Sequence, residues 1–360
     1  MITRVFRDWL SRFLPDEESV FLLCIIIISS IVLIYFGHLF APFLASIVIA
    51  FLMQGIVRQL KKYRLPHMLA VAIVFIGFIS MFFVLLLFIL PVIWEQLLRL
   101  VEQAPSMLAS LEQELNQFAT TSSDTFLLRI INEISTGIST MATAIGQWLV
   151  TFSLKSIDNI VAIALYAIVI PIFVFFLLKD ANLFIGQVSN LLPAKRVLLN
   201  KIWFEMESKL ANYVRGKAIE MLIVGIVTYI AFILIGLKFA ELLAIAVGVS
   251  VIIPYVGATV VTVPVILMAY LQWGLTSHFW WLVVAHFSIQ IIEGNILVPI
   301  LFSEAVNLHP IIILLSILVF GNLWGVLGVF FAIPLATLIK VIWLAWPEQQ
   351  VTEKPGVIPS

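Results

Sequence analysis

Long apolar runs separated by short polar links dominate this chain. A membrane-crossing helix needs about 20 mostly apolar residues. Five runs in the first two thirds of the sequence have roughly this length, so each is expected to be a membrane helix. These runs are Val20 to Phe36, Leu39 to Val57, Met68 to Ile93, Ile157 to Leu178 and Ala218 to Ile235.

Three other segments show the three-and-four spacing of amphipathic helices. Residues 1–18 predict an interfacial helix, for which an ordinary helical end is the alternative. Residues 94–156 predict two or three amphipathic helices, which need a partner for their apolar faces. Residues 179–217 predict a helix along the inner membrane face, with a plain connecting helix as the alternative.

Two uncharged stretches in the C-terminal third, Leu242 to Leu271 and Pro310 to Ile339, have an awkward length of about 30 residues each. One crossing uses about 20 residues and two crossings with a turn need more than about 40. Each stretch is therefore expected to be broken or re-entrant. The interrupting residues are Pro254, Gly257 and Pro264 in the first stretch, and Gly321, Asn322, Gly325, Gly328 and Pro334 in the second.

Such interruptions belong in a protected interior, because an unpaired backbone group in hydrocarbon costs several kcal/mol. Two Gly/Pro-interrupted segments in one transporter-like chain indicate a substrate site near the bilayer midplane. The weak similarity of PYVGATVVTVPVIL to WGVLGVFFAIPLATL would suit an internal repeat. The alternative is chance, since glycine and proline are common in membrane helices.

The segment SIQIIEGNILVP, residues 288–299, is the most polar patch of the C-terminal half. Glu293 shares a helix face with Gln290, and His286 precedes Gln290 by one turn. A carboxylate in the membrane is costly, so Glu293 should be paired, protonated or facing water, which favours a proton or cation relay. The alternative is a helix end near the interface, marked by Gly294 and Pro299. His286 itself is expected to be a packed histidine.

Composition agrees with this pattern. Hydrophobic residues make up 62% of the 360 positions, charged residues 11%, and the mean hydropathy is +1.16. Soluble chains carry about 25% charged residues, so this composition predicts an all-α, polytopic integral membrane protein with the lipid bilayer as its main partner. Basic and acidic residues number 20 each, which gives no indication of a nucleic-acid partner. The one cysteine, Cys24, excludes an intrachain disulfide.

Motifs for chemistry are missing from the sequence. It contains no Walker loop, HExxH, GxGxxG or metal-spaced Cys/His set. We therefore expect no cofactor and no metal, and we do not expect an enzyme. Basic residues set the expected orientation. The link with Arg58, Lys61, Lys62 and Arg64 and the link 179–217 should be cytoplasmic, whereas the acid-leaning segment 94–156 should lie outside and the N-terminus inside.

The interpretation divides the chain into seven parts by residue number. They are an interfacial helix 1–18, three membrane helices 19–93, an extracytoplasmic segment 94–156, a fourth membrane helix 157–178, a cytoplasmic segment 179–217, a C-terminal membrane core 218–346 and a polar tail 347–360.

Five motifs in order resemble the autoinducer-2 exporter family of permeases over nearly the whole chain. They are FFLLKD at 175–180, IIPYVGATVVTVP at 252–264, QIIEGNILVP at 290–299, LHP at 308–310 and GNLWGVLGVFFAIPLATL at 321–338. The resemblance implies a multi-pass protein of the bacterial inner membrane with about seven or eight membrane segments. It also implies a homo-oligomer, with a pentamer as one expected size.

The resemblance assigns the candidate substrate or ion pathway to the matching positions. These are Pro254, Tyr255, Gly257 and Pro264 in the first broken segment, Gln290, Glu293, Asn295 and Pro299 in the polar motif, and Gly325, Gly328 and Pro334 in the last. The motifs describe a scaffold, and substrate does not transfer with a scaffold.

Three functions remain open at this point. The first is a secondary transporter that exports a small solute resembling autoinducer-2, with proton or sodium coupling at Glu293. The second is a Na⁺/H⁺ antiporter. The third is a membrane scaffold whose outer helices hold partners and whose helix breaks are only structural. An intramembrane enzyme ranks last, because no nucleophile and base pair stands out.

Overall fold

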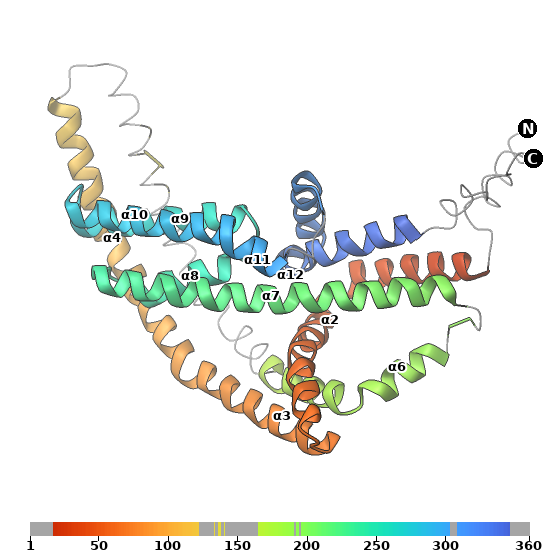
Figure 1. Ribbon diagram of the computed structural model, residues 1–360. Coiled ribbons are helices and arrows are strands. Elements are labelled where there is room, and N and C mark those ends of the chain that lie inside the picture. Colours follow the sequence, from red (N-terminus) through yellow and green to blue (C-terminus); the bar gives the residue numbers. More distant parts are fainter. Residues whose placement is uncertain are drawn as a thin grey trace, which may run out of the picture. The chain divides into compact units, whose positions relative to one another are not determined.

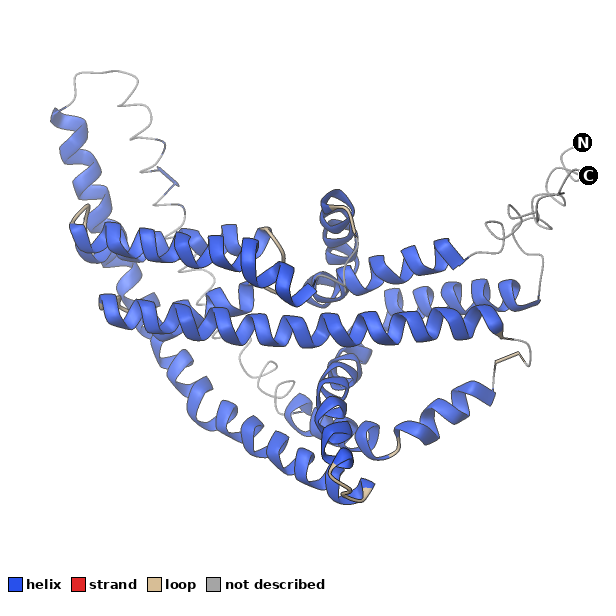
Figure 2. Cartoon of the chain, viewed as in Figure 1, coloured by secondary structure: helices blue, strands red, loops and turns tan. Residues whose placement is uncertain are grey.

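The structure is a computed structural model that describes residues 17–121, 165–190, 192–193, 196–302 and 308–345, together with the single positions 133, 136, 137 and 140. Within these ranges all regular structure is helical (Figures 1 and 2). The all-α fold expected from the sequence is confirmed. Residues 1–16 of the expected interfacial helix 1–18, the polar tail 347–360 and most of 122–164 lie outside the described residues.

The described chain separates into two compact units, the first built from three stretches of sequence and the second from two. Unit 1 comprises Met1–Phe75, Ile170–Glu220 and Ile296–Ser360, and unit 2 comprises Ile76–Val169 and Met221–Asn295. Each unit is therefore assembled from segments distant in sequence and is described by itself below.

Unit 1 begins with α2, Glu17–Lys62, which is one helix where the sequence predicts two. Pro42 lies inside α2, and Ser46 Oγ donates a hydrogen bond to the Pro42 carbonyl at 2.6 Å. Proline cannot donate its own backbone hydrogen bond, and α2 changes direction along its length in Figure 1. The two predicted membrane helices are thus one bent helix.

The other helices of unit 1 come from the middle and the end of the chain. Helix Leu165–Lys179, which belongs to unit 1 from Ile170 on, and α6, Ala181–Asn190, form a pair bent by 77° at Asp180. The remaining elements are the first part of α7 (Val197–Ile235), α11 (Val298–Phe302) and α12 (Pro310–Ala345). The helix α3, His67–Val84, starts in this unit.

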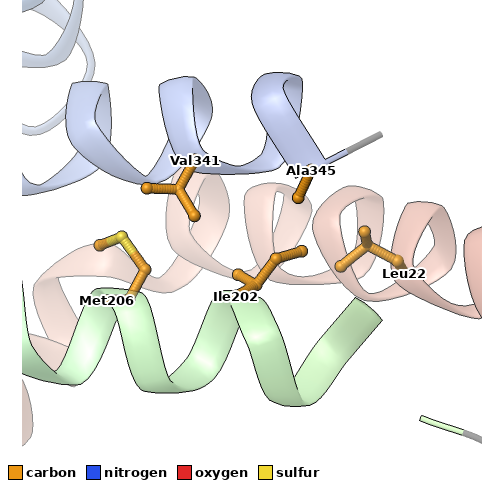
Figure 3. Packing of buried hydrophobic residues seen from close by; sticks show 5 residues of the cluster. All are labelled: Leu22, Ile202, Met206, Val341 and Ala345. Carbon is orange, nitrogen blue, oxygen red and sulfur yellow. The ribbon is translucent and has the colours of Figure 1, made fainter. Parts of the chain in front are cut away.

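An apolar cluster holds three of these helices together (Figure 3). Ile202 and Met206 of α7 pack against Leu22 of α2 and against Val341 and Ala345 of α12. Partly buried residues around the cluster include Leu198, Leu199 and Leu210, which complete the apolar stripe noted in the sequence. The stripe is helical as predicted, and the structure gives it protein partners from α2 and α12.

Unit 2 contains the end of α3, the π-helix η1 (Leu85–Ile89), α4 (Leu90–Thr121) and the second part of α7. It also contains α8 (Ala240–Ser250), α9 (Val256–Trp273) and α10 (Ser277–Ile292). Gln96 joins α4 to the start of α8, since its amide contacts Glu241 Oε2 at 2.5 Å and accepts from the Leu242 amide at 3.1 Å. Helix α4 is the amphipathic helix expected in the segment 94–156.

Glycine permits close packing of α7 on α8. A Cβ on Gly248 would lie 2.9 Å from the Gly225 Cα, a distance that real side chains do not tolerate. Small residues at such contacts let membrane helices approach closely and gain dispersion energy. This contact brings the second part of α7 against the short helix that precedes the first predicted break.

Large apolar side chains cover the exterior of many helices. Leu234 of α7 is 80% exposed and Trp343 of α12 is 70% exposed, values that would be unfavourable in water. Six described helices are long and apolar enough to cross a membrane, or up to seven if the bent pair at Asp180 forms one span. Length, composition and exposed apolar surface together indicate a polytopic membrane protein.

Candidate functional site

The first broken segment forms a tight turn between α8 and α9. Helix α8 has 11 residues, too short to cross a membrane, and ends before the turn residues 251–255. Pro254 lies in that turn and Tyr255 has a positive φ of 64°. Only glycine fits at position 257, because a Cβ there would lie 1.8 Å from the Ser250 carbonyl oxygen.

Several backbone amides of the turn are hydrogen-bonded within it, which lowers the cost of a break in the membrane. The Ile253 amide donates to the Ser250 carbonyl at 3.0 Å, and the Gly257 amide donates to the Ile253 carbonyl at 2.8 Å. Further along, Pro264 lies inside α9 on an exposed face. The expectation of a broken helix here is confirmed, with the break at Pro254 and not at Pro264.

The second broken segment lies within α12. The kink is at Gly325, whose φ of 61° and ψ of −137° are not helical. A Cβ on Gly328 would lie 1.7 Å from the Phe320 carbonyl oxygen, so backbone passes directly against backbone. Figure 1 shows the two parts of α12 running in different directions. Pro334 lies in the second part and is buried.

The two breaks share one design. In each, a short apolar helix ends, a residue with positive φ redirects the chain, and a glycine packs against the carbonyl of the preceding helix. A helix of span length follows in both, Val256–Trp273 in the first and Gly328–Ala345 in the second. This common geometry supports the internal repeat suggested by the sequence.

The polar motif continues α10 as a π-helix, η2, Glu293–Leu297. The following Pro299 has no amide to donate to an α-helical carbonyl, which accounts for the irregular turn before it. Glu293 is half-buried, and Asn295 is exposed and donates to the Ile291 carbonyl at 2.9 Å. The helix therefore does not stop at Gly294. π-Helical turns of this kind are frequent at functional sites.

The candidate residues divide between the two units. Unit 2 contains Pro254, Tyr255, Gly257, Pro264, Gln290, Glu293 and Asn295, and unit 1 contains Pro299, Gly325, Gly328 and Pro334. The structure thus brings the first break and most of the polar motif into one compact unit.

A buried ion pair in α7 was missed by the sequence interpretation. Lys217 Nζ lies 2.8 Å from Glu220 Oε2, and Glu220 is fully buried. Lys217 Nζ also lies 5.1 Å from the centre of the Phe302 ring, a cation–π geometry. The sequence interpretation placed Lys217 in a cytoplasmic link and began the next span at Ala218. The i,i+3 spacing of opposite charges at the head of an apolar run was the signal available.

Packing encloses this ion pair within unit 1. Tyr213 is buried one turn before Lys217, and its ring centre lies 5.8 Å from that of Phe302. Gly216 leaves room for the Phe302 ring, which would be 2.7 Å from a Cβ at that position. A buried ion pair in a membrane helix is costly to form, so it requires this close packing around both charges. Among the described residues, no group of three His, Cys, Asp or Glu side chains could hold a metal ion.

Comparisons with known proteins agree with this architecture. A sequence model of the AI-2E family of transporters matches residues 21–348. A protein of Escherichia coli (strain K12) that bears the name of a permease, PerM, is 39% identical over 351 residues, which cover 96% of this chain and 98% of the relative. Two proteins of Bacillus subtilis (strain 168) named as transport proteins also match: YueF is 26% identical over 87% of this chain and 85% of the relative, and YrrI is 28% identical over 85% and 86%. The chain therefore belongs to the AI-2E family of transporters.

Proposed function

We propose that this protein is a secondary transporter that moves a small polar solute across the bacterial inner membrane, with proton or sodium coupling. The observation that carries the proposal is the pair of helix breaks with one design, at Gly257 and at Gly328. Broken helices place amide and carbonyl groups of opened helix ends inside a membrane protein, where they bind substrates and ions. A purely structural role gives no reason for building such a break twice.

Glu293 is the proposed coupling residue. Its carboxylate is half-buried at the start of a π-helical turn, inside a helix otherwise suited to cross the membrane. An ionisable group at membrane depth is retained for a functional reason by default. In this role the carboxylate would bind a proton or a sodium ion in one state of the cycle and release it in the other.

A solute resembling autoinducer-2 is the proposed cargo, moving outward. Support for this cargo comes from the family to which the chain belongs. The proposed orientation has a cytoplasmic N-terminus and α4 outside, based on the basic links around Arg58 and Lys201. A homo-oligomer, with a pentamer as one size, also stays a proposal.

A Na⁺/H⁺ antiporter is the second candidate function, and the same half-buried Glu293 favours it. In that case the carboxylate would exchange the two cations and a hydroxylated solute would have no effect. The scaffold alternative is favoured only by the amphipathic helix α4.

The test is flux through liposomes that contain the purified full-length protein, with internal pH recorded under sodium or autoinducer-2 gradients. Glu293→Gln is compared with wild type and with Glu102→Gln, which makes the same change at an exposed position of α4. We expect Glu293→Gln to abolish coupled flux and Glu102→Gln to retain it. A scaffold would instead tolerate Glu293→Gln and Gly257→Leu and lose its function on removal of the outer helices.

A further inference from the structure

Three buried polar atoms of unit 2 make no hydrogen bond to any described part of the chain. They are His286 Nδ1, Gln290 Nε2 and Thr228 Oγ1. His286 and Thr228 are both 0% exposed, so bulk water does not reach their side chains. Folded proteins leave few such groups without a partner, and each exception calls for an explanation.

The helix directions place these atoms on adjacent helices. Gln272 near the end of α9 bonds to the Gly236 carbonyl and to the Lys238 amide just beyond α7, so α7 and α9 end together and run in the same direction. Helices α9 and α10 are antiparallel, since Thr262 contacts His286 and Tyr270 contacts Phe279. Figure 1 shows α9 and α10 side by side. Helix α10 is therefore antiparallel to α7.

This arrangement sets the levels of the three side chains. The Phe232 ring of α7 lies 6.2 Å from the His286 ring, centre to centre. Thr228 precedes Phe232 by one turn and Gln290 follows His286 by one turn, so along the antiparallel helices both lie on the same side of the Phe232–His286 contact. This order predicts that the three side chains face a common volume between α7 and α10.

The hydrogen bonds of His286 fix its neutral tautomer. Thr262 Oγ1 donates to the Ala258 carbonyl at 2.7 Å, so at 2.9 Å from His286 Nε2 it accepts a hydrogen bond from that nitrogen. Nε2 therefore carries the proton, and Nδ1 presents a lone pair. The Gln290 amide is a donor and the Thr228 hydroxyl is both donor and acceptor. These are the partners that one small hydroxylic guest requires.

We propose that His286, Gln290 and Thr228 bind a buried water from which His286 takes up a proton. On uptake, a proton delivered through the water bonds to Nδ1, and the resulting imidazolium donates from Nδ1 to the water oxygen and from Nε2 to Thr262. On release, the proton returns through the water and Nδ1 regains its lone pair. This inference deepens the proposed proton coupling. Its role in transport rests on the proposed function, whereas proton binding by His286 is independent of it.

The neighbouring groups leave His286 as the proton acceptor of this volume. Phe232 of α7, Thr262 of α9 and the adjacent Phe287 contact the ring, and none of them titrates near neutral pH. The phenol of Tyr270 lies farther along α9, near Phe279. On α10 itself the ionisable groups are His278 and Glu293, each about two turns away.

The test is nitrogen NMR of the histidine rings in the full-length protein, labelled with ¹⁵N-histidine, in lipid nanodiscs. The His286 signals are assigned by their loss in His286→Gln. From about pH 8 to pH 3 we expect a neutral ring with the proton on Nε2 to become protonated on Nδ1. Gln290→Leu and Thr228→Val, which remove partners of the water, should each move the titration midpoint by about one pH unit. His278→Gln, at an exposed position of the same helix, should leave the midpoint unchanged.

A ring that stays neutral over this pH range, or a midpoint identical in wild type, Gln290→Leu and Thr228→Val, would overturn the proposal. The titration is repeated with sodium chloride and with choline chloride. A midpoint that follows sodium would identify a cation as the guest and reject the water. Titration as expected in a protein without flux would reject the transport proposal alone, whereas flux with an unprotonated His286 would reject this site alone.

Discussion

Glycine at two positions decides where the membrane core can fold back on itself. The conformational freedom of glycine matters at Gly325, which has a positive φ, but at Gly257 and Gly328 the requirement is space. At those two positions the backbone of one helix passes within contact distance of a carbonyl of the preceding helix. A sequence pattern of glycine and proline indicates a break. Only the structure identifies the glycine at which a side chain would clash with the neighbouring carbonyl.

Gly257→Ala should therefore destabilise the protein. Its methyl group would lie 1.8 Å from the Ser250 oxygen, so the turn must move, at a cost of about 1–3 kcal/mol or more. The matched control is Gly77→Ala in α3, where no atom lies within 4 Å of the added Cβ. Thermal unfolding in detergent should show a lower Tm for Gly257→Ala alone. Equal Tm values for the two variants would contradict the close contact.

The ion pair of α7 gives a second prediction at this scale. Lys217→Met leaves the buried Glu220 carboxylate without its cation, which should cost about 3–5 kcal/mol. The double variant Lys217→Met/Glu220→Leu removes both charges and should regain much of that loss, because an apolar pair of similar volume avoids desolvation. Thermal unfolding of the single and double variants checks this order. A double variant less stable than Lys217→Met would show that the pair does not act as a unit.

Helices in this protein continue where polar sequence suggests that they end. Lys201, Lys209 and Lys217 suggest a link before the span at Ala218, yet α7 runs unbroken from Val197 to Ile235. The residues between contain neither proline nor a capping glycine that would stop it, and the apolar stripe at Ile202 finds partners on α2 and α12. Sequence periodicity predicted the helix and its apolar face, but the partner of that face depends on residues over 100 positions away.

The contribution of this packing can be measured with two variants of α7. Ile202 is 6% exposed within the three-helix cluster, and Phe204 is 69% exposed on the same helix. Ile202→Ala should lower stability by about 2 kcal/mol or more through the cavity it leaves, and Phe204→Ala should have a small effect. Unfolding monitored by the protein's tryptophan fluorescence distinguishes them. A larger loss for Phe204→Ala would mean that the exposed face, and not the cluster, supports α7.

At the scale of the whole molecule, the sequence predicted the class of protein and its family, because composition and motif order depend on many residues at once. The two breaks and the amphipathic α4 are present, and the described parts of the apolar runs are helical as predicted, although residues 157–164 lie outside the described chain. Local pattern could indicate the pairing of Lys217 with Glu220 but not the burial of Glu220 or the setting of His286, since both depend on contacts between helices. Most candidate pathway residues lie in the two breaks and the polar motif, whereas Pro264 and Pro334 lie inside the helices that follow the breaks. The roles of all of them in transport are predictions.

The most direct test of the central claim is transport by the wild-type protein itself. Purified protein shown to be folded is inserted into liposomes, and solute and ion fluxes are compared with protein-free liposomes under imposed pH, sodium and autoinducer-2 gradients. We predict a protein-dependent flux that is driven by a proton or sodium gradient. The absence of flux under every gradient, from folded and inserted protein, would contradict a transporter built on two broken helices.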